Sequence, residues 1–292
     1  MKSGFVSLLG RPNTGKSTLL NRIIGSKIAI TSPRLQTTRT KIMGIRNGPD
    51  HQIIFFDTPG LHKAPGTFNK RMLNSAYKAG KESDLLLYLV EASHYNNVDD
   101  VKNLKKIVGE NIPIILIINK IDLVARLELL PQIDHYRQVI DFAEIFPLSA
   151  LKGDNVASLS ETIVKYLPEG PAYYPQDMIT DQTERFIVAE FIREKLIKLT
   201  RQEVPYACAT AVESMKVDEK KKIARIHATI IVKKESQRGI LIGKSGMQLK
   251  EITRLARKEI ESFLGLSVVL EIWVKVSPKW QVNETILKNF GY

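Results

Sequence analysis

Residues 10–17 read GRPNTGKS, and this short glycine-rich segment constrains the fold more than any other part of the chain. It follows an apolar stretch, Gly4–Leu9, typical of a buried strand, and it leads into a helical pattern over Ser17–Gly25. A G-x-x-x-x-G-K-S segment in this setting turns its backbone N–H groups toward phosphate oxygens at the positive end of the helix. We expect Lys16 to reach the β- and γ-phosphates and Ser17 to bind Mg²⁺. The segment therefore predicts a nucleotide phosphate site.

Apolar runs alternate with helical stretches through the rest of the N-terminal part. The runs are Gln52–Phe56, Leu85–Glu91, Ile112–Ile118 and Glu144–Leu148, and the helical stretches are Phe68–Ala79, Val98–Gly109 and Asn155–Leu167. Each run is continuously apolar, as expected for strands that helices cover on both faces. This alternation predicts an α/β P-loop domain with a mostly parallel sheet over residues 1–168.

Residues 167–175 read LPEGPAYYP and contain three prolines. Proline fixes φ and lacks an amide hydrogen, so neither a helix nor a central strand is expected to continue through this segment. We therefore expect a linker over residues 169–181 and a second domain over residues 182–292.

The pattern after the linker predicts a smaller α+β domain. Thr183–Thr200 is predicted to be an amphipathic helix, and its apolar stripe consists of Phe186, Ala189, Ile192, Leu196 and Leu199. Two alternating stretches, Ala207–Lys216 and Ala224–Lys233, predict strands joined by a charged turn. A glycine loop, a helix near residues 247–263 and a strand over Ser267–Val276 complete the order α-β-β-loop-α-β.

A second nucleotide motif, Asp57-Thr58-Pro59-Gly60, directly follows the run that ends at Phe56. A carboxylate at a strand end beside the phosphate loop can hold the Mg²⁺ shell, and the Gly60 N–H can contact the γ-phosphate. For an isolated D-x-P-G sequence, a turn without a ligand is the alternative.

A third motif, Asn119-Lys120-Ile121-Asp122, follows the run that ends at Ile118 and indicates the base. A carboxylate accepts two hydrogen bonds from a purine edge with adjacent N–H donors, which guanine has and adenine lacks. We assign this role to Asp122, with the Lys120 stem over the ring and Asn119 joining neighbouring loops. Backbone N–H groups of residues 149–151 would bind the guanine oxygen. Buried donors and acceptors reject the wrong base strongly, since it leaves them unpaired.

Together these motifs predict a guanine nucleotide site. The predicted nucleotide-binding residues are Gly10, Arg11, Pro12, Asn13, Thr14, Gly15, Lys16, Ser17, Thr18, Asp57, Thr58, Pro59, Gly60, Asn119, Lys120, Asp122, Ser149, Ala150 and Leu151.

The three motifs, in this order, resemble the Ras-type GTPases of the bacterial translation-associated branch. The resemblance implies that Leu35-Gln36-Thr37-Thr38-Arg39 is the first switch and that Thr38 closes over Mg²⁺ and the γ-phosphate, with Thr37 as the alternative. The Mg²⁺ ligands would then be Ser17, Thr38 and Asp57. The residues expected to act on the transferring phosphate are Lys16, Thr38, Gly60 and Asn13.

Leu61 departs from the Ras pattern, because Ras-type enzymes that position water have glutamine after this glycine. Leucine can neither orient nor polarise water, so we expect slow intrinsic hydrolysis or a need for help. In relatives with this substitution, an asparagine at the position of Asn13 recruits K⁺. The alternative role of Asn13 is to stabilise the turn of the phosphate loop.

The chain is strongly basic, which favours a polyanionic partner: 43 lysines and arginines stand against 31 acidic residues, a net charge of +12. The C-terminal part contains I-G-K-S-G, in which two glycines flank a basic residue before a helix. Such a loop lets a nucleic-acid backbone approach closely. Leu249, Ile252, Ala256, Ile260 and Phe263 form the predicted buried stripe of that helix.

The loop resembles the GXXG loop of a KH domain, and the element order resembles the bacterial type II arrangement. The predicted RNA-binding residues are Arg238, Gly239, Ile240, Ile242, Gly243, Lys244, Ser245, Gly246, Lys250, Arg254 and Arg257. For the charges alone, a solvated helix face is the alternative. We expect Trp273 and Trp280 to pack in the core, with base stacking by Trp280 as an alternative.

A Ras-type domain followed by a type II KH domain resembles the Era family of bacterial GTPases. Segments such as Val204-Pro205-Tyr206 and the C-terminal Asn289-Phe290-Gly291-Tyr292 carry the same resemblance. It implies a factor that assists small ribosomal subunit assembly and binds the single-stranded 3′ end of small-subunit rRNA. It also implies peripheral association with the inner face of the cell membrane.

The sequence argues against three classes of protein: membrane-spanning, secreted and disulfide-rich. No apolar run approaches the roughly 20 residues of a membrane-spanning helix, and the N-terminus does not resemble a secretory signal. One cysteine excludes an internal disulfide framework. We expect a soluble, cytoplasmic and monomeric protein.

Overall fold

The computed structural model describes residues 1–34, 37–61, 67–94, 98–107 and 112–290. The chain forms two compact units, Met1–Asp181 and Gln182–Tyr292. Within the described residues, no helix is both long and apolar enough to cross a membrane.

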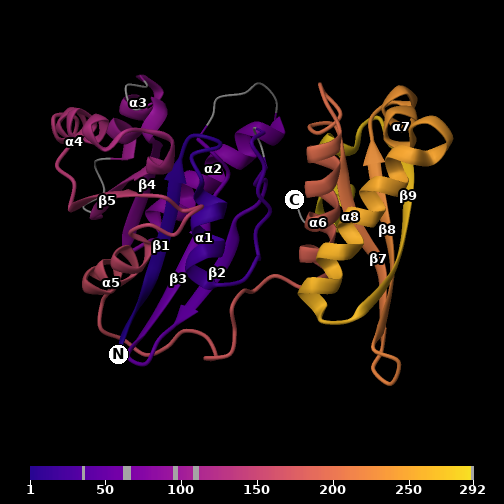
Figure 1. Ribbon diagram of the computed structural model, residues 1–292, viewed down its shortest axis with the longest axis horizontal. Helices are drawn as coiled ribbons and strands as arrows, with labels where there is room; N and C mark the ends of the chain where they lie inside the picture. Colours follow the sequence, from indigo (N-terminus) through magenta and orange to yellow (C-terminus); the bar gives the residue numbers. More distant parts are fainter. Residues whose placement is uncertain (35–36, 62–66, 95–97, 108–111, 291–292) are drawn as a thin grey trace. The chain divides into compact units, whose positions relative to one another are not determined.

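The N-terminal unit is built on a six-stranded sheet with the order β2-β3-β1-β4-β5-β6 (Figure 1). Its strands are β1 Lys2–Gly10, β2 Ile42–Asn47, β3 His51–Asp57, β4 Leu85–Glu91, β5 Ile114–Asn119 and β6 Glu144–Leu148. Only the β2–β3 pairing is antiparallel; the other pairings are parallel. The predicted mostly parallel sheet is therefore confirmed, with β2 as an edge strand that the prediction missed.

Helices connect these strands: α1 Lys16–Ile24, α2 Thr67–Lys81, α3 Val98–Ile107, α4 Leu129–Arg137 and α5 Val156–Tyr166. Helix α4 was not predicted; its sequence LLPQIDHYR contains a proline in the first turn. Proline is tolerated there, since the first helical N–H groups lack partners in any helix. The predicted end of the helix at 98–109 lies outside the described residues.

The segment that we expected to be a linker, residues 169–181, is hydrogen-bonded to the N-terminal sheet. Gln52 accepts hydrogen bonds from the backbone N–H groups of Tyr173 at 2.7 Å and Tyr174 at 3.0 Å, and its amide donates to the Tyr174 carbonyl at 2.8 Å. Farther along, the Ile45 N–H donates to the Ile179 carbonyl and the Thr180 hydroxyl donates to the Met43 carbonyl. Residues 169–181 thus belong to the first compact unit.

The C-terminal unit is a three-stranded sheet with helices. Its elements are α6 Glu184–Leu199, β7 Ala209–Asp218, β8 Ile223–Val232, α7 Glu235–Ile242, α8 Met247–Leu264, β9 Ser267–Val276 and α9 Glu284–Asn289. Strands β7 and β8 are antiparallel and β8 and β9 are parallel. The predicted loop before α8 was too long, because residues 235–242 form helix α7.

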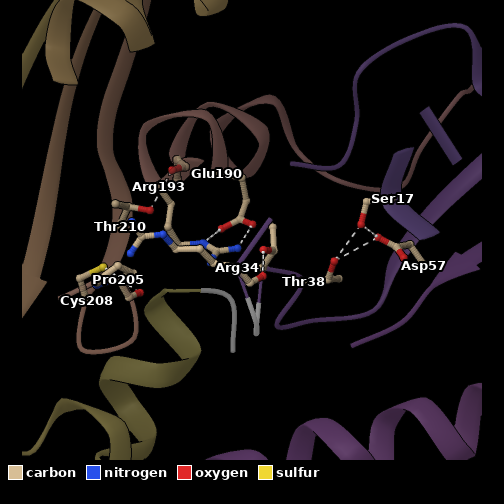
Figure 2. Close-up of polar contacts among 11 residues, drawn as sticks. Ser17, Arg34, Thr38, Asp57, Glu190, Arg193, Pro205, Cys208 and Thr210 are labelled. Carbon is tan, nitrogen blue, oxygen red and sulfur yellow. Dashed lines mark hydrogen bonds and ion pairs between the residues drawn. The ribbon is translucent and has the colours of Figure 1, made fainter. Parts of the chain in front are cut away.

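Helix α6 begins as predicted, with the Thr183 hydroxyl accepting from the Phe186 N–H at 3.3 Å. The predicted one-sided stripe is wrong, however, because every residue from Ile187 to Ile197 is buried. The charged residues among them form ion pairs: Arg193 donates to both carboxylate oxygens of Glu190, at 2.6 and 2.5 Å (Figure 2). The amphipathic pattern assumes that charged residues face solvent, so it could not predict that paired charges are buried.

The two tryptophans differ. Trp280 is fully buried and its indole N–H donates to the Ala207 carbonyl at 3.0 Å, as expected for a packing residue. Trp273 lies on β9 and is 63% exposed, so the expectation that it packs in the core is wrong.

Candidate nucleotide and RNA sites

The phosphate loop lies between the end of β1 and the start of α1. Three of its residues have positive φ angles: Gly10 at 143°, Asn13 at 67° and Gly15 at 98°. A Cβ on Gly15 would collide with the side-chain amide of Asn119, and one on Gly10 would collide with the carbonyl of Leu89. The curl of the loop therefore requires glycine at both positions.

Lys16 is buried beneath this loop. Its ammonium donates to the carbonyl oxygens of Arg11 at 2.8 Å and Gly10 at 3.2 Å. Burial lowers the pKa of Lys16 to about 8, although the charges of Asp57 and Asp100 act to raise it. An ammonium in this position gains a strong partner when phosphate oxygens arrive, which is the chemistry predicted for it.

Three oxygen-bearing side chains meet beside the loop (Figure 2). The Ser17 hydroxyl donates to Oδ2 of Asp57 at 2.5 Å and lies 2.9 Å from Oγ1 of Thr38. Thr38 donates to the same Asp57 oxygen at 3.2 Å. Burial raises the pKa of Asp57, and the hydrogen bond from Ser17, the charge of Lys16 and the hydrogen bond from Thr38 oppose this rise.

The other carboxylate oxygen of Asp57, Oδ1, is buried and has no hydrogen-bond partner among the described residues. A buried carboxylate oxygen without a partner is costly unless a cation lies beside it. Hydroxyl and carboxylate oxygens are the protein ligands that Mg²⁺ prefers. Ser17, Thr38 and Asp57 therefore fit the predicted Mg²⁺ site.

Of the two threonines proposed for the first switch, Thr38 contacts Ser17 and Asp57 of the predicted Mg²⁺ site. The Thr37 hydroxyl donates instead to the Arg34 carbonyl at 2.7 Å. Leu35 and Gln36 lie outside the described residues. A Cβ on Gly60 would lie 2.6 Å from the backbone nitrogen of Pro12, so Gly60 lies directly against the phosphate loop.

The predicted base-binding motifs are joined by direct hydrogen bonds. The Asn119 amide donates to the Thr14 carbonyl at 2.7 Å, and its oxygen accepts from the Ala150 N–H at 3.0 Å. Asn119 thus joins the phosphate loop to the loop after β6, as predicted. The Ser149 hydroxyl donates to Oδ1 of Asp122 at 2.6 Å, which orients the carboxylate assigned to guanine.

Lys120 has a left-handed backbone, with φ 66°, and its ammonium lies 2.9 Å from Oε1 of Glu91. Burial alone would raise the pKa of Glu91, but the hydrogen bond and charge of Lys120 lower it overall. Glu91 ends β4 and pairs in register with Asn119 at the end of β5. Sequence reasoning missed Glu91, although its place at a strand end was a usable signal.

Leu61 points into the core and not toward the phosphate site. It is buried in one cluster with Leu9, Tyr88 and Leu104, and its backbone N–H donates to the Gly10 carbonyl at 2.9 Å. This packing explains why an apolar residue suits the position. The structure therefore offers no water-orienting side chain at residue 61.

The predicted RNA loop begins later than expected. Arg238, Gly239, Ile240 and Ile242 belong to helix α7, and the loop proper is Gly243–Gly246. Gly243 and Gly246 have φ angles of 70° and 76°, and a Cβ on Gly243 would lie 2.7 Å from Cβ of Gln248. Lys244 and Ser245 are at the tip, where Ser245 also has a positive φ of 52°.

A groove of about 530 Å³ runs beside this loop between α8 and β9. Its lining residues are Gly246, Leu249, Lys250, Thr253, Arg254, Arg257, Val268, Val269, Leu270 and Ile272. It therefore contains three of the predicted RNA-binding cations together with an apolar wall from β9 that sequence reasoning missed. Single-stranded bases are recognised in such grooves, where a base meets apolar side chains and the phosphates meet cations.

Comparisons with known proteins cover both units. Residues 5–120 match the family described as 50S ribosome-binding GTPase, and residues 203–281 match the KH domain. The GTPase Era of Syntrophus aciditrophicus (strain SB) is 47% identical over 291 residues, which cover 100% of this chain and 95% of that protein. The chain belongs to the Era family of GTPases.

Solved structures of Era agree with this assignment. A variant of Aquifex aeolicus Era bound to GDP and AlF₄⁻ is 40% identical, with a TM-score of 0.95 over 100% of this chain and 99% of that one. Era in complex with MgGDPNP and nucleotides 1506–1542 of 16S ribosomal RNA is 41% identical, with the same TM-score and coverage. The predicted fold class, a P-loop GTPase domain followed by a smaller KH domain, is confirmed.

In this Era-family chain, the structure brings together the nucleotide motifs but not all of the predicted RNA residues. The phosphate loop, Asp57, Gly60 and the Asn119–Asp122 segment are linked through the contacts described above. Lys250, Arg254 and Arg257 share the groove. Arg238 and Gly239 lie in α7 and do not line it.

Proposed function

We propose that this protein is a GTP-hydrolysing switch that binds the single-stranded 3′ end of small-subunit rRNA and assists small ribosomal subunit assembly. The observation that carries the proposal is the presence, in one chain, of a guanine nucleotide site and a basic KH groove, each built from its expected motif. The 47% identity to a curated GTPase Era and the likeness to Era bound to 16S rRNA support the choice of RNA.

For hydrolysis, the chain's own residues supply charge and positioning. Lys16 donates to phosphate oxygens, while Ser17, Thr38 and Asp57 hold Mg²⁺, which when bound offsets negative charge on the phosphates. The Gly60 N–H contacts the γ-phosphate. Leu61 is packed in the core, so we assign the placement of the attacking water to a backbone group near the first switch.

We extend the proposal to K⁺ at Asn13. The Asn13 amide donates to the Pro33 carbonyl at 2.6 Å, so this side chain already links the phosphate loop to the segment before the first switch. That bond also supports the alternative role, in which Asn13 stabilises the loop. A K⁺ ion beside Oδ1 would supply positive charge where Leu61 cannot act.

The RNA part of the proposal rests on the groove. Lys250, Arg254 and Arg257 would bind phosphates, and the loop Gly243–Gly246 would let the backbone approach. Nucleotide state would gate RNA affinity, because γ-phosphate contacts at Thr38 and Gly60 order the switches. For its setting we propose a monomer in the cytoplasm that associates peripherally with the inner face of the cell membrane.

The test is GTP hydrolysis with Mg²⁺, in K⁺ and then in Na⁺, with and without a single-stranded RNA of the small-subunit rRNA 3′ end. We expect turnover that rises with the RNA and that depends on K⁺. The affinity for the same RNA is measured with a non-hydrolysable GTP analogue and with GDP. Equal affinities in the two states would remove the switch from the proposal.

Leu61 favours a second candidate, an RNA-binding scaffold in which guanine nucleotide is structural and turnover is negligible. Lys16→Ala separates the two functions. A scaffold would lose thermal stability in this variant, because its nucleotide contributes to folding. A switch would lose only the nucleotide-dependent change in RNA affinity.

A further inference from the structure

Asp100 is a fully buried carboxylate on α3, outside the nucleotide motifs. One oxygen, Oδ2, accepts from Nε of Arg11 at 2.9 Å, and the other, Oδ1, accepts from the Tyr88 hydroxyl at 3.0 Å. Burial raises the pKa of Asp100, and the charge and hydrogen bond of Arg11 oppose that rise. An unpaired carboxylate in this position would be costly, so the contact with Arg11 ties α3 to the phosphate loop.

Arg11 is the second residue of the phosphate loop, and its backbone contacts two other residues of that loop, Lys16 and Thr14. Its carbonyl oxygen accepts from the Lys16 ammonium at 2.8 Å and from the Thr14 hydroxyl at 3.0 Å. The side chain of Arg11 is therefore held by Asp100, while its main chain holds Lys16. If the Arg11 side chain were displaced, we expect its backbone carbonyl to shift, and this carbonyl accepts the hydrogen bond from the Lys16 ammonium.

Tyr88 fixes Asp100 from the opposite side. It is buried on β4 in the same apolar cluster as Leu61, the residue that follows Gly60. Burial, together with the charge of Asp100, raises the pKa of Tyr88 well above its ordinary value, so the phenol stays protonated and remains a donor. Asp100 thus has a rigid donor on one oxygen and the loop arginine on the other.

We propose that Asp100 is a positioning residue for GTP hydrolysis, which holds Lys16 in place through Arg11. Catalysis by a phosphate loop depends on the placement of charge, and displacement by about 1 Å is enough to slow a reaction about a hundredfold. GDP lacks the γ-phosphate, so a small displacement of Lys16 removes fewer of its predicted contacts from bound GDP than from the GTP that is being hydrolysed. The rate of hydrolysis should therefore suffer more than nucleotide affinity.

The experiment compares Asp100→Asn with Asp99→Asn, its exposed neighbour in the first turn of α3. Single-turnover hydrolysis at saturating GTP and Mg²⁺ gives the rate, titration with GDP gives the Kd, and thermal unfolding reports folding. For Asp100→Asn we expect the rate to fall about tenfold, with the GDP Kd changed less than about threefold. Asp99→Asn should behave as the unmodified protein.

A double variant tests the route. If Asp100 acts through Arg11, then Arg11→Gln/Asp100→Asn is no slower than the slower single variant, whereas independent effects would multiply. Multiplied effects, an unchanged rate in Asp100→Asn, or equal losses of rate and GDP affinity would each overturn the proposal. If Asp100→Asn fails to fold, Tyr88→Phe decides, because it removes only the hydroxyl: a rate about two- to threefold slower at unchanged Kd supports the proposal, and an unchanged rate overturns it.

Discussion

The hydroxyl of Ser149 lies 2.6 Å from Oδ1 of Asp122, 27 residues earlier in the chain. The two residues come from the loops after β6 and β5, whose strands are parallel neighbours. Because the Ser149 hydroxyl donates to Oδ1, this hydrogen bond holds the Asp122 carboxylate in one orientation. The carboxylate predicted to select guanine is therefore held in place by the neighbouring loop.

Asp122→Asn should change which base is preferred. An amide presents a donor where the carboxylate had only acceptors, so it matches a purine with a carbonyl at C2, as in xanthine. We expect GTP affinity to fall at least about a hundredfold and XTP to bind better than GTP. Competition between the two nucleotides measures the preference. Asp154→Asn, an exposed acid in the loop after β6, is the control and should leave it unchanged.

The lowered pKa of Lys16 predicts a pH dependence of nucleotide binding. With a pKa of about 8 in the free protein, Lys16 loses its proton above this pH, whereas bound phosphates keep it protonated. Binding therefore takes up a proton as the pH rises through about 8, and GDP affinity falls about fivefold between pH 8 and pH 9, after a plateau that ends about one pH unit below the pKa.

Calorimetric titration in buffers of different ionisation enthalpy would detect the proton uptake. Lys16→Arg is the control for this prediction, because arginine stays charged throughout this range. Its GDP affinity is expected to be weaker overall but flat between about pH 7 and pH 9. A steep fall in the arginine variant as well would assign the titration to another group.

Thr38 and Thr37 give a matched pair for the first switch. Thr38→Ala removes a hydroxyl that lies 2.9 Å from Ser17 and 3.2 Å from Asp57, whereas the Thr37 hydroxyl donates to the Arg34 carbonyl. We expect Thr38→Ala to reduce the Mg²⁺-dependent gain in GTP-analogue affinity about tenfold. Thr37→Ala should retain that gain. Titrations with and without Mg²⁺ check both, and the opposite ranking would reassign the ligand.

The sequence was sufficient to predict which nucleotide motifs lie together, because each motif is local. Each motif occupies a few consecutive residues at a strand end, and parallel strands bring those ends together without further information. Glu91 and Asp100 were not predicted, because their contacts are not local. Each acts on a motif residue, Lys120 or Arg11, that is distant along the chain. The position of Glu91 at a strand end was its one sequence signal, and Asp100 has no sequence pattern of its own.

Long-range contacts also explain where the predicted organisation was incomplete. The prolines of residues 167–175 correctly predict the end of regular structure, but no local pattern shows that Gln52 binds Tyr173 and Tyr174. The burial of helix α6 also depends on pairing between side chains: Arg193 is fully buried and pairs with Glu190. A charged residue in a sequence pattern indicates an exposed position, except where the charge is paired inside the fold.

Glycine substitutions in the C-terminal unit separate helix from loop. Gly239 lies inside α7, and an added methyl group would meet nothing within 4 Å, so Gly239→Ala should stabilise the unit by about 0.5–1 kcal/mol. Gly243→Ala should destabilise it by at least about 1 kcal/mol, because φ is 70° and the new Cβ would lie 2.7 Å from Gln248. Chemical denaturation measures both, and RNA affinity should be retained in the first variant only.

Arg257 and Lys258 test the groove with adjacent cations. Arg257 lines the groove between α8 and β9, whereas Lys258 is exposed and does not line it. Each contact between a cation and a phosphate of single-stranded RNA contributes about −0.7 to the slope of log affinity against log salt concentration. Arg257→Gln should therefore make the slope shallower by about 0.7, and Lys258→Gln should leave it unchanged. Filter binding of the rRNA 3′-end oligonucleotide across a salt series measures both slopes. Equal changes in the two variants would show that the whole helix face attracts RNA, without a defined path along the groove.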